Sequence, residues 1–95
     1  MSTTDQLPQD APFPPASLTI LISTLATQAM VALGNIPNPA TKAIEKHLGM
    51  AKHLIDTLDV LEQKTRGNCN EQESHLLERA LHELRLAYVN QTKGG

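Results

Sequence analysis

The feature that most constrains this chain is a long stretch without charge. No Asp, Glu, Lys or Arg occurs between Asp10 and Lys42, and the part from Leu18 to Gly34 is strongly apolar. A membrane span needs about 20 apolar residues, and this shorter run is interrupted by threonines, Ser23 and Gln28. No basic cluster flanks it, and the proline-rich start lacks the positive charge of a signal peptide. We therefore expect no membrane insertion.

The spacing of apolar residues predicts a helix from Ser17 to Leu33. Ser17 is a suitable N-cap, and Gly34 fits the position that follows a helix end. One face carries apolar residues at intervals of three or four: Leu18, Ile22, Leu25, Ala29 and Leu33. Ile20, Met30 and Val31 lie off that face. A helix that is apolar nearly all round is usually buried nearly all round, and in so small a protein a second subunit is the simplest cover.

Residues 1–16 form a segment of different character. They include Pro8, Pro12, Pro14 and Pro15, which block helix formation. We expect a disordered arm. The alternative is that Phe13 and its neighbouring prolines dock on a partner groove.

Two further helices are predicted after a rigid connector that ends in Pro37-Asn38-Pro39. The second should run from Lys42 to Arg66, capped by Thr41 and stopped by Gly67. Its apolar seam keeps helical spacing: Ile44, Leu48, Ala51, Leu54, Ile55, Leu58, Leu61 and Thr65. Lys52–Asp56 and Glu62–Arg66 are spaced to form ion pairs on its outer face.

The third helix should open at Asn70, which forms a capping box with Glu73. Its seam comprises Leu77, Ala80 or Leu81, Leu84 and Tyr88, with Arg79 and Glu83 able to pair outside it. The helix should fray near Asn90, which leaves residues 92–95 as a disordered tail and 17–91 as the domain.

These elements predict an all-α fold, a three-helix hairpin-type bundle completed by homodimerisation. With 95 residues, a monomer core supplies only about 3–5 kcal/mol. The single cysteine cannot form an internal disulfide and fits a reducing cytoplasm. Oligomerisation is therefore the first candidate for additional stability.

Three runs of the sequence carry a resemblance to a known family: TLATQAMVALGNIPNP, AKHLIDTLDVLEQKTRGN and ELRLAYV. They resemble a bacterial family of small helical proteins of unknown function, over roughly Leu18 to Val89. The most specific parts are QAMVALGxIPxP and KT[KR]GN. The family usually has an apolar residue where this chain has Cys69, which implies a packing role for that thiol. The resemblance implies a helical fold and a cytoplasmic bacterial setting, and no activity.

Catalytic and metal chemistry lack the residues they need. His47 and His53 fall on different faces of a helix, and His75 and His82 are about 10.5 Å apart along one. Glu78 and His82 together would give two ligands of the three or four that metal sites use. Cys69 near His75 lacks a third catalytic member, and Asp56 and Asp59 fit a solvated face. We expect no enzyme activity, metal or other cofactor.

Gln28 is the most unusual polar residue because it lies in the apolar helix. One interpretation is that its amide caps backbone groups of the Pro37–Pro39 connector. The other is that it pairs across a subunit interface and fixes its register.

The sequence therefore favours a homodimeric protein-interaction module without catalysis, with a further, unidentified protein partner left open. The alternative is a binder of a small apolar ligand or lipid chain in a groove along the first helix. The slight negative charge and low aromatic content argue against nucleic acid. The candidate interface comprises Ile22, Leu25, Ala26, Gln28, Ala29, Met30 and Leu33.

Overall fold

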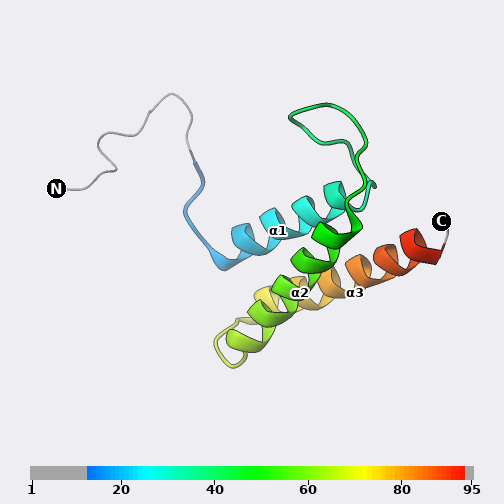
Figure 1. Cartoon of the computed structure of the whole chain (residues 1–95). Coiled ribbons are helices and arrows are strands. Elements are labelled where there is room, and N and C mark those ends of the chain that lie inside the picture. The colour runs from blue at the N-terminus through cyan, green and yellow to red at the C-terminus, as the bar shows by residue number, and fades with distance from the viewer. Residues whose placement is uncertain (1–12, 94–95) are drawn as a thin grey trace.

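The computed structural model describes residues 13–93, and within them all regular structure is helical (Figure 1). Helix α1 spans Leu18–Ala32, α2 spans Leu48–Lys64 and α3 spans Glu71–Lys93. Each helix contacts the other two. The predicted all-α, three-helix fold is confirmed. The predicted disordered arm lies mostly outside the described residues, and residues 13–16 are exposed and non-helical.

Both ends of α1 follow from local sequence. Ser17 is extended, and its hydroxyl accepts a hydrogen bond from the Ile20 N–H at 3.1 Å. At the other end, Gly34 adopts a φ of 80°. The Gly34 N–H then donates to the Val31 carbonyl, and the Asn35 N–H donates to the Met30 carbonyl, each at 3.0 Å. These two hydrogen bonds define a Schellman motif, in which glycine adopts the left-handed conformation without the strain that a side chain would cause.

Helix α2 begins at Leu48, six residues later than the predicted start at Lys42. Lys42 has a φ of 62°, which is incompatible with a helix. Its N–H donates to the Asn38 carbonyl at 2.6 Å, and the Asn38 N–H donates to the Ala43 carbonyl at 2.9 Å. The His47 N–H donates to the Ala32 carbonyl at the end of α1, at 2.7 Å. Residues 42–47 thus close a loop on α1, and Ile44 is exposed instead of joining the predicted seam.

The turn between α2 and α3 matches its prediction closely. Gly67 has a φ of 86° and follows the end of α2. The Asn70 side chain accepts from the Glu73 N–H at 2.8 Å, and the Glu73 carboxylate accepts from the Asn70 N–H at 2.9 Å. This reciprocal pair is the predicted capping box. Helix α3 does not end near Asn90 but continues to Lys93.

The core lies between the three helices and is entirely aliphatic. Its buried members are Ile22, Ala29, Ala32, Leu33, Ala51, Leu54, Ile55, Leu58, Leu77, Leu81 and Leu84. Successive helices run in opposite directions, so α1 and α3 lie side by side in the same direction (Figure 1). Only one side of α1 is buried by its own chain, so the prediction of burial nearly all round is not met within one subunit.

Candidate interaction surface

The outward side of α1 is uncharged and partly apolar. Ile20 and Leu21 remain 42% and 45% exposed. The other exposed residues of this helix are uncharged and polar: Thr19, Ser23, Thr24, Thr27 and Gln28. The Thr24 hydroxyl donates to the Ile20 carbonyl at 2.8 Å, so its hydrogen bond is made inside the helix. The Thr24 hydroxyl therefore keeps its hydrogen bond when another surface covers this side.

The predicted interface residues divide into three groups. Ile22, Ala29 and Leu33 are 0% exposed and belong to the chain's own core. Leu25, Ala26 and Met30 are half-buried beside that core. Gln28 is exposed. Periodicity placed Ile22, Ala29 and Leu33 on one face and Ile20 off it, but it did not show whether that face meets α2 and α3 or a second copy.

A groove runs between α1 and α3, and we call it the α1–α3 groove. It encloses about 240 Å³. Its lining residues are Ile22, Ser23, Ala26, Thr27, Met30, Leu76, Arg79, Ala80, Glu83 and Leu84. Small side chains of both helices form its middle, which allows a close approach by another helix.

The rim of the α1–α3 groove carries one charge of each sign. Arg79 Nε lies 4.0 Å from Glu83 Oε2, and the two side chains are 79% and 67% exposed. An ion pair this long and this exposed contributes little to stability within the chain. Both charges remain accessible to a partner. The prediction that Arg79 and Glu83 pair outside the seam is confirmed.

A second hollow lies on the other side of α1, against the loop that precedes α2. It measures about 440 Å³ and is lined by Thr27, Gln28, Val31, Ala32, Asn38, Pro39, Glu45, His47 and Met50. We call it the α1–loop hollow. Sequence reasoning missed it, because residues 42–47 of the loop were expected to be the first turns of a helix.

Glu45 organises the loop wall of this hollow. Its carboxylate accepts from the Thr41 hydroxyl at 2.9 Å and from the Asn38 amide at 3.3 Å, and His47 Nε2 lies 3.7 Å away. The hydrogen bond from Thr41, then that from Asn38, lowers the pKa of Glu45 from its usual 4.5. The sequence signal for this loop was a pair of short polar side chains, Asn38 and Thr41, next to the prolines and followed by Glu45, which can accept hydrogen bonds from both.

Gln28 lines the α1–loop hollow and is exposed within one subunit. Because its amide is not buried, it has no need of the connector's backbone groups, and the interpretation as a connector cap rests on no hydrogen bond among the described residues. Its proposed pairing with a second subunit stays a prediction.

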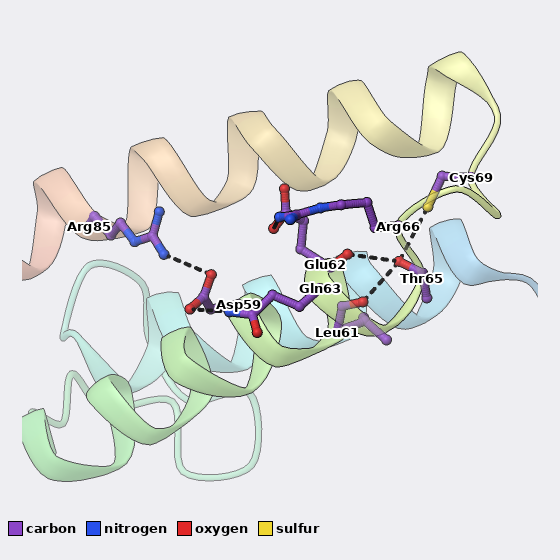
Figure 2. A network of polar contacts seen from close by, with 8 residues as sticks. All are labelled: Asp59, Leu61, Glu62, Gln63, Thr65, Arg66, Cys69 and Arg85. Atoms are coloured by element: carbon purple, nitrogen blue, oxygen red, sulfur yellow. Dashed lines mark hydrogen bonds and ion pairs between the residues drawn. The ribbon is translucent and has the colours of Figure 1, made fainter.

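The residues weighed for catalysis or metal binding are spread over the surface. Within residues 13–93, no group of three or more His, Cys, Asp or Glu side chains is placed to hold a metal ion. Asp56 pairs with Lys52 at 2.8 Å, as predicted. Asp59 instead accepts from Arg85 of α3 at 3.2 Å and from Gln63 at 3.2 Å (Figure 2).

Cys69 packs half-buried against the core at the end of the α2–α3 turn. Its thiol lies 3.3 Å from the Thr65 hydroxyl, which itself donates to the Leu61 carbonyl at 2.8 Å (Figure 2). The predicted ion pair between Glu62 and Arg66 forms beside it, at 3.0 Å. These contacts place Cys69 in a turn that holds two helices together.

The fold and surface define a small helical bundle with an uncharged, partly open helix face. Residues 15–90 match the family described as Domain of unknown function (DUF1844), and the chain belongs to that family. No curated protein and no solved structure matches the chain. Among the described helices, none has the length and apolarity that crossing a membrane requires.

Proposed function

We propose that this protein is a non-catalytic, cytoplasmic protein-interaction module that works as a homodimer through the outward side of α1. The observation that carries the proposal is the exposure of Ile20 and Leu21 on a helix without a single charge. Charged residues normally mark the solvent face of a helix, as they do on α2 and α3 of this chain.

A second copy suits this surface because the contact would be isologous. Each patch then meets its own image, so any net charge on the patch would repel itself. The uncharged side of α1 avoids that repulsion. Fully burying a large aliphatic side chain contributes roughly 1.5–3 kcal/mol. Covering the exposed 42% of Ile20 and 45% of Leu21 on each of two copies supplies part of that value four times, which is substantial beside what a core of this size supplies.

Two matched substitutions test the proposal. Ile20→Glu on α1 and Val60→Glu on α2 each replace an exposed β-branched residue, 42% and 52% exposed, by the same charge. In sedimentation equilibrium at micromolar concentration, the unmodified chain and Val60→Glu should be dimeric, and Ile20→Glu should be monomeric and still helical by circular dichroism. A monomeric unmodified chain, or equal behaviour of the two variants, would overturn the proposal.

The α1–loop hollow favours a second candidate function, the binding of a small apolar ligand. Its volume of about 440 Å³ falls in the range of about 300–1,000 Å³ typical of ligand sites. Val31 and Met50 supply apolar surface, and Gln28 supplies a hydrogen-bonding amide. Titration with 1-octanol should shift the methyl NMR signals of Val31 and Met50 before others. Unchanged signals at the solubility limit of 1-octanol would remove this candidate.

A further inference from the structure

Both helices that flank the α1–α3 groove contribute small residues to its lining. Ala26 and Thr27 lie at the middle of the lining on α1, and Ala80 lies at the middle of the lining on α3. We call these three residues, which line the groove from both helices, the small-residue belt. A second pair of helices can approach closely at that belt.

Arg79 and Glu83 are placed on either side of this belt. They are the only charged residues among the described residues that line the groove. A two-fold axis that crosses both helices at the level of the belt turns α3 into an antiparallel copy of itself. Arg79 of each copy then lies opposite Glu83 of the other, so the rim is complementary to its own image.

We propose that the α1–α3 groove is a charge-coded self-recognition site, in which α1 crosses α1 and α3 crosses α3 of a second copy. Two ion pairs, each from Arg79 to Glu83 of the other copy, set the antiparallel register. This inference rests on the proposed function. It extends the contact from the outward side of α1 to the adjoining α1–α3 groove, which shares Ser23 and Thr27 with that side, and it adds the means by which a second copy is selected. The uncharged α1 contributes no competing charge, since none occurs between Asp10 and Lys42.

The weakness of the pair within one chain supports this role. Arg79 and Glu83 are 4.0 Å apart and most of each side chain is exposed, so either side chain can leave this ion pair at little cost and bind a group on a second copy. By contrast, Lys52 and Asp56 on α2 make a pair at 2.8 Å and lie outside the groove. The two pairs have the same spacing along a helix and differ in position, which makes the second a matched control.

The test is a mixing experiment with two charge variants. Arg79→Glu leaves two negative charges on the rim, and Glu83→Arg leaves two positive charges. Each variant alone should dimerise at least about 10-fold more weakly than the unmodified chain at low salt. An equimolar mixture should form heterodimers with an affinity within about threefold of the unmodified homodimer, and 0.5 M NaCl should reduce the difference. The double variant Arg79→Glu with Glu83→Arg should also recover dimerisation.

The control mixture combines Lys52→Glu with Asp56→Lys and should show no preference for heterodimers. Sedimentation of fluorescently labelled chains measures each affinity, and circular dichroism checks folding. A dimeric unmodified chain whose variants show no preference would overturn this inference and leave the proposed function standing. A monomeric unmodified chain would overturn both.

Discussion

The side-chain amide of Gln91, near the end of α3, donates a hydrogen bond to the side-chain oxygen of Asn35 at 3.0 Å. The two residues are 56 positions apart in the chain. Asn35 is the last residue of the Schellman motif of α1, so this contact joins the last turns of α3 to the end of α1. The contact lies in the part of α3 that continues past Asn90.

Gln91→Ala should therefore loosen the last turns of α3. We expect the free energy of unfolding to fall by about 1 kcal/mol or less, because the bond is exposed. Amide exchange at residues 88–93 should accelerate. Asn90→Ala, at an exposed neighbouring position, serves as the control, and equal exchange in both variants would contradict a specific role for Gln91.

Ala29→Glu should unfold the chain whatever its oligomeric state. Ala29 is 0% exposed, so the new carboxylate would enter the core without a partner. The expected loss exceeds about 3 kcal/mol, comparable to the whole stability of a domain this small. Thermal unfolding followed by circular dichroism measures it. Val60→Glu, at an exposed position of α2, should keep a cooperative transition, and a folded Ala29→Glu variant would disprove the assigned core.

Two glycines should respond to alanine with opposite signs. Gly67 has a φ of 86°, so Gly67→Ala should destabilise the chain by about 1–2 kcal/mol. Gly49 lies in the first turn of α2, and an added Cβ there meets nothing within 4 Å. Gly49→Ala should therefore stabilise by up to about 1 kcal/mol. Urea denaturation measures both, and a shared sign would be inconsistent with these backbone conformations.

The loop before α2 should contribute to acid sensitivity through Glu45. The hydrogen bonds from Thr41 and Asn38 lower the folded-state pKa of Glu45 below 4.5. A group with a lowered pKa adds stability above its unfolded pKa, and that contribution is lost as pH falls through the folded value. The melting temperature of the unmodified chain should thus fall more between pH 5 and about pH 3 than that of Glu45→Gln. Parallel curves for the two proteins would refute this contribution.

Cys69→Ala should lower the free energy of unfolding by about 1 kcal/mol or less, because the side chain is only half-buried. The dimer dissociation constant should not change, since Cys69 lies outside the α1–α3 groove. Sedimentation and denaturation of the variant check both expectations. A changed dissociation constant would implicate the turn in self-association.

The elements that could be predicted from sequence were those determined by local chemistry. Ser17 caps α1, Gly34 and Gly67 take left-handed conformations, and Asn70 pairs with Glu73, because each of these features involves residues within a few positions of one another. Heptad-like spacing likewise identified the buried residues of α2 and α3.

Tertiary structure decided what local patterns left open. Helix α2 begins at Leu48 and not at the predicted Lys42, because residues 42–47 bond to Asn38 and to the end of α1. Helix α3 continues past the predicted end near Asn90, and there Gln91 bonds to Asn35 at the end of α1. The same holds for α1: helical spacing separates Ala29 from Ile20, but only the positions of α2 and α3 determine that the face of Ala29 is covered by the chain itself while Ile20 faces outward. Periodicity records that a side chain is apolar, whereas its burial depends on which neighbour the fold brings to it.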